Sequence, residues 1–263
     1  MFKSVGEPGS TRRNLHSLWV LSARDLRVRY ATSWLGYLWS ILDPLVMSLI
    51  YWFVFTQIFK RSVIGADPYI VFLIAAMLPW VWFNACISDF THAFQRDAKL
   101  VRSTAIPRVI WVGRIILSKG IEFLLAIPVL VLFVVFTGAE VTWGALWFPV
   151  AILLQTALLT GLGLILAPLC VLFDDLERTT RLVLRALFYA TPIIYSAKDL
   201  PASIAWLPVI NPLDGIFSMY RSAFFPDQWS TSSVIGSVVW TIVLLIAGAL
   251  IFRRLERSVL KEL

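Results

Sequence analysis

Long apolar runs alternate with short polar segments along the whole chain. A helix needs about 20 mostly apolar residues to cross the hydrocarbon core of a bilayer. The runs, of which the fifth is the shortest, extend over residues 37–59, 69–90, 110–136, 143–173, 182–195 and 234–252. The pattern predicts an all-α membrane protein with six transmembrane helices.

The positive charges gather in alternate connecting segments. Four clusters consist of Lys3, Arg12, Arg13, Arg24, Arg27 and Arg29; of Arg96, Lys99, Arg102 and Arg108; of Arg178, Arg181 and Arg185; and of Arg253, Arg254, Arg257 and Lys261. The other side holds only Lys60, Arg61, Lys198 and Arg221. Cytoplasmic segments of membrane proteins are enriched in Lys and Arg. Six spans place all four clusters and both termini in the cytoplasm, whereas five would put one cluster on the wrong side.

This topology divides the chain into three parts. We expect a cytoplasmic tail with an interfacial helix in residues 1–36, a transmembrane domain in 37–253 and a short cytoplasmic tail in 254–263. No short apolar segment with a cleavage site precedes the first run, so we expect no signal peptide.

The segment from Arg13 to Tyr30 has the pattern of an amphipathic helix rather than that of a uniformly apolar span. One face carries Leu15, Leu18, Trp19, Leu26 and Tyr30, and the opposite face carries Arg13, Arg24 and Arg27. Such a pattern predicts an amphipathic helix in the membrane interface. Val20, Leu21 and Val28 depart from the stripe, which indicates that protein partly covers the far side. A plain solvated basic helix is the alternative.

Between the last two runs, residues 197–229 form two short apolar pieces punctuated by proline. Each is too short to span, and irregular backbone at membrane depth survives only when it is buried in protein or lines a cavity. We expect a re-entrant helical hairpin on the outer side. An ordinary loop on the outer surface is the alternative.

Composition agrees with a membrane protein and narrows the chemistry. The chain is 59% hydrophobic with a net charge of +7, whereas soluble domains are about 45–50% apolar. The charge follows from the cytoplasmic clusters, and no long Lys/Arg block suggests a nucleic-acid partner. Cys86 and Cys170 lie inside apolar runs, and His16 and His92 are far apart, so we expect neither a disulfide nor a metal site.

No catalytic motif is present. The sequence has no phosphate-binding loop of the G-x-x-x-x-G-K-[ST] type and no G-x-S-x-G. Asp174, Asp175 and Glu177 stand beside arginines, where a solvated ion-pair network is favoured over an active site. We therefore expect no catalytic residues.

Three charges, Arg114, Lys119 and Glu122, fall inside the third run. Charge in a span is costly and faces protein or water. The i, i+3 spacing of Lys119 and Glu122 predicts an ion pair; contact with an anionic lipid or substrate head is the alternative.

Aromatic residues fall into two groups. Those near run ends are expected to form interface belts: Trp34, Trp39, Trp80, Trp82, Trp143 and Trp147. Those inside runs are expected mainly to pack, and are also suited to line a path for sugars: Tyr51, Trp52, Phe53, Phe55, Phe59, Phe188, Tyr189 and Tyr195.

Several short motifs occur in an order that resembles the permease subunits of polysaccharide-export ABC transporters. The motifs are Arg24-Asp25-Leu26, Val28-Arg29-Tyr30, Ser33-Trp34-Leu35-Gly36, Pro44, Leu78-Pro79-Trp80, Lys99-Leu100-Val101-Arg102, Ile106-Pro107, Asp175-Leu176, Thr191-Pro192-Ile193, Asn211-Pro212-Leu213 and Tyr220-Arg221. Asp174 stands where that family often has arginine, so no role of that arginine carries over.

The resemblance implies a six-span subunit of a bacterial cytoplasmic membrane that works as a homodimer with two copies of a separate ATPase. ATP and magnesium would bind the ATPase, and this chain would hold no cofactor. The resemblance implies ATPase coupling through Arg24, Arg27, Arg96, Lys99 and Arg102, and a central conduit that includes Tyr51, Trp52, Phe188, Tyr189 and Tyr195. It also implies that the outer hairpin gates the far end of the conduit, with Trp206, Asn211, Pro212 and Arg221 as its gating residues. The cargo would be a polyprenyl-diphosphate-linked polysaccharide, O-antigen or galactan-like.

Other functional classes remain open on sequence alone. An ABC permease for a small molecule would share the fold but not the glycan substrate. A membrane glycosyl- or acyltransferase would need an essential acid or base, for which His92, Asp174, Asp175 and Glu177 are the candidates. An ion channel would conduct without any ATPase partner.

Overall fold

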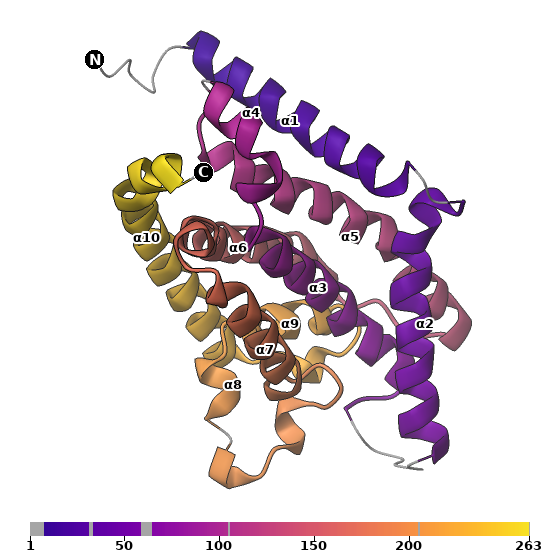
Figure 1. The fold of residues 1–263 in the computed structure, drawn as a ribbon. Helices are drawn as coiled ribbons and strands as arrows, with labels where there is room; N and C mark the ends of the chain where they lie inside the picture. Colours follow the sequence, from indigo (N-terminus) through magenta and orange to yellow (C-terminus); the bar gives the residue numbers. More distant parts are fainter. Residues whose placement is uncertain (1–7, 32–33, 59–64, 105, 205, 263) are drawn as a thin grey trace.

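The computed structural model describes residues 8–31, 34–58, 65–104, 106–204 and 206–262, and every regular element within them is helical (Figure 1). The α-helices are α1 (Pro8–Tyr30), α2 (Trp39–Phe53), α3 (Tyr69–Phe90), α4 (Ala98–Ser103), α5 (Val109–Thr137), α6 (Trp147–Leu172), α7 (Asp175–Ala190), α8 (Leu207–Ile210), α9 (Asp214–Ser222) and α10 (Thr231–Glu262). Lys3, Ser33, Phe59, Lys60 and Arg61 lie outside the described residues, as do the side chains of Tyr30 and Phe55.

Four helices are long and apolar enough to cross a membrane: Tyr69–Phe90, Val109–Thr137, Trp143–Leu172 and Thr231–Glu262. They coincide with the second, third, fourth and last predicted runs. The last helix is longer than predicted, since α10 continues through most of the expected tail at 254–263. Val259 is buried on this extension, so the end of the helix packs against the rest of the protein.

The first and fifth predicted runs form shorter helices. Helix α2 has 15 residues and continues as one π-helical turn, Val54–Ile58. Helix α7 has 16 residues, about 24 Å, and begins at Asp175 rather than near 182. The interpretation of the arginines after the fourth run as loop residues was therefore wrong, because Arg178, Arg181 and Arg185 all lie on α7.

Helix α1 packs along α5, and the two lie side by side in Figure 1. Leu21, Ser22 and Leu26 are buried, whereas Leu15 and Trp19 are exposed. The stripe predicted from periodicity is thus divided: Leu26 belongs to the protein interface, and Leu15 and Trp19 point away from it. Of the three residues that depart from the stripe, Leu21 is covered by protein, whereas Val20 and Val28 are exposed, so the expected cover is present only at Leu21.

Helices α6 and α10 pack closely through glycines. A methyl group on Gly161 would lie 2.7 Å from the backbone of Leu244, and one on Gly248 would lie 2.5 Å from the carbonyl oxygen of Gly161. Small residues at helix contacts let backbones approach, as is common between membrane helices. This closely packed pair lies on the side of the molecule away from α2 (Figure 1).

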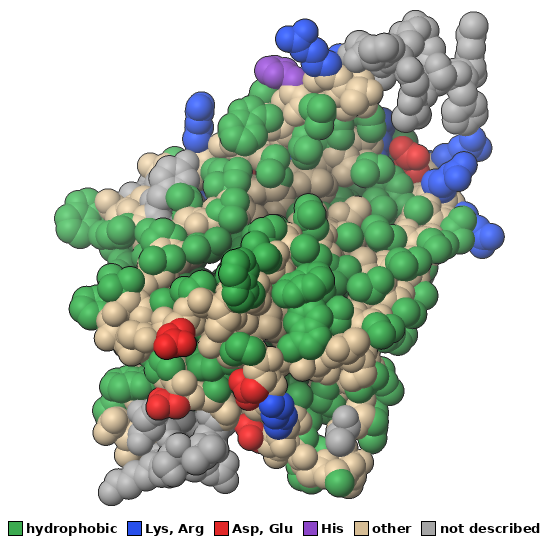
Figure 2. Space-filling model, turned by 180° about the vertical axis from the view of Figure 1, so that it is seen from behind, with side chains coloured by type: hydrophobic (Ala, Val, Ile, Leu, Met, Phe, Trp, Pro, Cys, Tyr) green, Lys and Arg blue, Asp and Glu red, His purple; other side chains and the backbone are tan. Residues whose placement is uncertain are grey.

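The surface separates apolar and charged regions. Figure 2 shows a broad hydrophobic face, with Lys and Arg gathered at the end that carries α1. The C-terminal end of α10 lies at that same end (Figure 1). Trp34 and Trp143 are strongly exposed, as a belt requires, but Trp80 and Trp82 are buried in the middle of α3. Their assignment to a belt was wrong because α3 is surrounded by other helices.

Candidate functional site

A groove of about 530 Å³ lies between α2, α3 and α7. One part of its lining is aromatic, from Tyr51, Trp80, Phe188 and Tyr189. Another part is polar, from Asp43, Asn84, Ser88, Arg181 and Arg185. The groove therefore offers flat apolar faces and hydrogen-bonding groups to the same ligand.

Phe188 is the centre of the aromatic part. Its ring centroid lies 5.4 Å from that of Trp80, 5.9 Å from that of Tyr51 and 5.2 Å from that of Tyr189. These separations fall in the range of interacting aromatic pairs. The rings come from α2, α3 and α7, so the lining depends on the packing of all three helices.

The structure brings together three of the five aromatics that were expected to line a conduit: Tyr51, Phe188 and Tyr189. Trp52 packs against the hydrophobic core, as Tyr51 and Phe188 do, but it does not line the groove. Tyr195 lies just beyond the groove, where its hydroxyl donates to the carbonyl of Tyr189 at 2.9 Å.

Trp80 is a groove residue that sequence reasoning missed. A signal was present, because Met77, Trp80, Asn84 and Ser88 recur at helical spacing and all line the groove.

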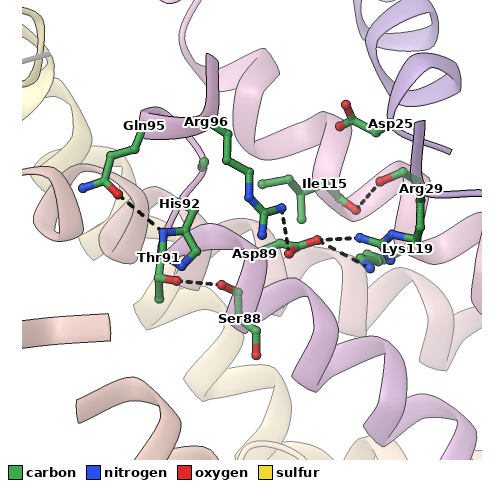
Figure 3. A network of polar contacts seen from close by, with 12 residues as sticks. Asp25, Arg29, Ser88, Asp89, Thr91, His92, Gln95, Arg96, Ile115 and Lys119 are labelled. Carbon is green, nitrogen blue, oxygen red and sulfur yellow. Dashed lines mark hydrogen bonds and ion pairs between the residues drawn. The ribbon is translucent and has the colours of Figure 1, made fainter. Parts of the chain in front are cut away.

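A second polar feature, an ion-pair network, joins α1, α3 and α5. Asp89 accepts contacts from Arg29 at 3.0 Å, Arg96 at 3.1 Å and Lys119 at 3.4 Å, and Figure 3 shows the three cations converging on it. Glu122 lies 3.0 Å from Arg29 and 3.5 Å from Lys119. The Lys119–Glu122 pair predicted from spacing is present.

The same network continues toward Arg114. This side chain is buried, and its guanidinium lies 2.7 Å from Asp97 and 3.2 Å from Asp25. Arg24 contacts the same two carboxylates at 2.7 and 3.2 Å. A cavity of about 580 Å³ adjoins these groups. Two arginines thus share two acids, and the buried charge is compensated within the chain.

Asp97 lies between α3 and α4, and its pKa reflects this arrangement. Partial burial opposes ionisation, but the hydrogen bond from Arg24 and the charge of Arg114 outweigh it and lower the pKa of Asp97 below its ordinary value. The carboxylate is therefore held ionised, and it ties the start of α4 to α1.

The residues expected to couple to an ATPase fall into two groups. Arg24 and Arg96 are engaged in the ion-pair network. Arg27, Lys99 and Arg102 are exposed at the end of the molecule that carries α1 and α4. Arg96 is also exposed, so what separates the two groups is their ion pairs rather than their exposure.

At the opposite end, Arg221 holds the segment that was expected to form a gate. Its guanidinium donates to the carbonyls of Phe72 at 3.3 Å, Pro192 at 2.6 Å and Ile193 at 2.5 Å. It also lies over the Phe72 ring at 3.6 Å. Arg221 is therefore an internal clamp between α9, the start of α3 and the segment after α7.

Asn211 is a second fastening point. Its side-chain amide donates to Thr191 at 2.8 Å, and its oxygen accepts from the Leu213 backbone at 3.0 Å. Pro212 follows it at the turn into α9, whose nine residues are all buried. Trp206, by contrast, is exposed.

Within the described part of the chain, no group of three or more His, Cys, Asp or Glu side chains is arranged to hold a metal ion. Cys86 and Cys170 are buried free thiols. His92 lies 3.5 Å from Glu177, which also pairs with Arg181 at 2.8 Å. Glu177, one of the acids considered as a candidate catalytic group, is thus engaged in ion pairs.

Comparison with known proteins identifies the family of this chain. Residues 16–225 match the ABC-2 type transporter family. The chain is 31% identical over 238 residues to the O-antigen export system permease protein RfbA of Klebsiella pneumoniae, covering 90% of this chain and 91% of the relative. It is 26% identical to RfbA of Myxococcus xanthus, over 88% and 89% of the two chains. It is 24% identical to the polysialic acid transport protein KpsM of Escherichia coli, over 91% and 93%. The chain therefore belongs to the membrane subunits of the ABC-2 type transporter family.

Proposed function

We propose that this chain is the permease subunit of an ATP-driven exporter that moves a polyprenyl-diphosphate-linked polysaccharide across the bacterial cytoplasmic membrane. The observation that carries the proposal is the groove between α2, α3 and α7. It combines four clustered aromatic rings with a polar end, and the relatives matched over nine tenths of the chain are named for O-antigen export. An O-antigen or galactan-like polymer is the proposed cargo.

In this proposal the chain crosses the membrane six times. Helix α2 with its π-helical turn forms the first span, and α7 with the segment after it forms the fifth. Helices α8 and α9 form a re-entrant hairpin at the outer end. An even number of spans agrees with the arrangement in which α1 and the end of α10 lie at the same, Lys- and Arg-rich end (Figures 1 and 2).

Two copies would form the conduit. The groove of one chain is open on one side, and the adjoining surfaces of α2 and α7 expose large apolar side chains: Met47, Ile50, Phe53, Leu182, Val183 and Tyr189. A second copy facing this surface would close the two grooves into one path. Aromatic faces bind sugar rings without the strong directional hydrogen bonds that would hold the polymer in place.

The ATPase would dock at the end that carries α1 and α4, through Arg27, Lys99 and Arg102. Arg24 and Arg96 would act one step further inside. They pair with Asp97 and Asp89, and these two acids also pair with Arg114 and Lys119 of α5. A displacement of α1 or α4 by the ATPase would then move the transmembrane helices with it as a rigid body. ATP and magnesium would bind only on the partner.

The test is co-purification of this chain with the ATPase encoded beside it. We expect a complex of two permease and two ATPase subunits whose ATP hydrolysis needs both proteins and is stimulated by lipid-linked glycan more than by drug-like amphiphiles. A chain that purifies without a partner and conducts ions in a bilayer would contradict the proposal, as would stimulation by amphiphiles alone.

A further inference from the structure

The polar end of the groove contains two arginines to which neither the relatives nor the ion-pair network assigns a role. Helix α7 carries Arg178, Arg181 and Arg185, of which Arg181 and Arg185 line the groove and Arg178 does not. The two groove arginines are four residues apart, so they lie on one face of the helix. Phe188 and Tyr189 follow Arg185 on that same side, one helical turn further along.

Arg185 lies well inside α7. It is ten residues beyond the start of the helix at Asp175, which corresponds to about 15 Å along the axis. A guanidinium at membrane depth is costly unless it faces water, protein partners or a ligand. The groove supplies the opening that such a charge requires.

The pairing of Arg185 differs from that of the buried Arg114 and Arg221 and from that of Arg181, which is exposed as Arg185 is. Arg114 shares two carboxylates, Arg221 donates to three carbonyls, and Arg181 pairs with Glu177 at 2.8 Å. Among the described residues, no carboxylate lies within ion-pair distance of Arg185. Arg185 is exposed and lines the groove, so its guanidinium is available to a ligand there.

The rest of the polar end completes a site for an anion. Asn84 and Ser88 of α3 line the same groove and offer neutral hydrogen-bond donors. Asp43 of α2 is the acid on the lining, and its charge limits how far an anion can move toward α2. Arginine forks bind phosphate oxygens in a bidentate manner, which a lysine cannot reproduce.

We infer that Arg185, assisted by Arg181, binds the diphosphate that joins lipid to sugar, and that Phe188 and Tyr189 receive the first sugars one turn further out. This inference rests on the proposed function and adds the site at which the diphosphate between lipid and sugar is bound. The lipid tail would remain in the bilayer beside α2, while the glycan enters the aromatic part of the groove.

Binding of a defined probe tests the site. The full-length chain in phosphatidylcholine nanodiscs is titrated with radiolabelled farnesyl diphosphate, with farnesyl monophosphate and farnesol as comparisons. We expect the diphosphate to bind most tightly, because it makes the most charge-assisted hydrogen bonds. Arg185→Gln should weaken its binding about tenfold or more, and Arg181→Gln by a smaller factor. Arg185→Lys should fall between Arg185→Gln and the wild type.

Arg178→Gln is the matched control, since it removes the same charge from the same helix outside the groove, and it should bind as the wild type does. Equal binding by wild type and Arg185→Gln would overturn the inference, as would equal affinity for diphosphate and farnesol. Addition of phosphatidylglycerol to the nanodiscs distinguishes a lipid-phosphate site: loss of diphosphate binding on that addition would show that ordinary headgroups occupy it and would also overturn the inference.

Export in cells separates this inference from the proposed function. If the wild-type complex exports glycan and Arg185→Gln exports at the same rate, the diphosphate site is wrong and the exporter stands. If the wild-type complex exports no glycan, the proposed function itself fails. The inference predicts export by the wild type and by Arg178→Gln, and a strong reduction in Arg185→Gln.

Discussion

The ion-pair network and the groove differ in whether their cations have carboxylate partners. In the network, Arg24, Arg29, Arg96, Arg114 and Lys119 each meet at least one carboxylate at 3.5 Å or less. In the groove, Arg181 has such a partner but Arg185 has none among the described residues. Compensated charge fastens helices together, whereas uncompensated charge beside a cavity is available to a ligand. The position of a charge in a span therefore says less about its role than its partners do.

The largest effect should come from breaking the network at its most buried member. Arg114→Met leaves Asp25 and Asp97 with one arginine between them, and loss of one partner of a buried pair costs about 3 kcal/mol or more. Thermal unfolding in detergent should show a clearly lower midpoint than for Arg185→Met, whose groove position carries no such pair. Equal midpoints for the two variants would remove the distinction between the regions.

Reversal of the exposed cations should come next and should act on coupling rather than stability. The proposed docking of Lys99 and Arg102 implies acidic groups on the ATPase, to which Lys99→Glu with Arg102→Glu would present like charges. Like charges at an interface cost several kcal/mol, so association should weaken about a hundredfold. Arg254→Glu, an exposed change on α10 at the same end, serves as the control. Co-purification of the double variant at the wild-type yield would contradict the proposed docking surface.

Removal of the groove aromatics should have a moderate effect on transport. Phe188→Ala with Tyr189→Ala deletes the centre of the ring cluster, and loss of stacking of this kind slows passage about fivefold. The rate of ATP-dependent glycan export measures it, with the exposed Phe136→Ala on α5 as control. An unchanged rate would mean that the polymer does not travel along these rings.

The smallest effect concerns pH and belongs to the network alone. Asp97 has a lowered pKa in the folded protein, so its contribution to stability is present above its unfolded pKa, near 3.9, and is lost as pH falls through the folded value. The unfolding midpoint of the wild type should therefore drop more below about pH 4 than that of Asp97→Asn. Parallel pH curves for the two proteins would show that Asp97 is not held by Arg24 and Arg114.

The long helices could be predicted because their apolar runs are continuous, and the bounds of α3 and α5 agree with the runs to within a residue. Helix α7 was misjudged because three arginines on its polar face interrupt the apolar run in the sequence, so hydropathy marked only its second half. Hydropathy also cannot tell whether an apolar face meets lipid or protein, which is why Trp80 was assigned to a belt.

Contacts between distant segments were beyond sequence reasoning. The pair of Lys119 and Glu122 follows from local spacing, but Arg29 and Glu122 are 93 residues apart and meet only through the packing of α1 on α5. The same holds for Arg221, which reads as an isolated charge on the outer side and is in fact a clamp on three backbone carbonyls.

The central claim is that the groove between α2, α3 and α7 is the path of the polymer, and site-specific photo-crosslinking tests it most directly. A photoreactive phenylalanine analogue replaces Tyr189 in the groove, or Val135 or Ile242 on exposed faces of α5 and α10. The complete transporter is then illuminated during ATP-driven export. The account predicts glycan crosslinked at position 189 and absent at 135 and 242. Glycan trapped at the outer faces with none at 189 would contradict it.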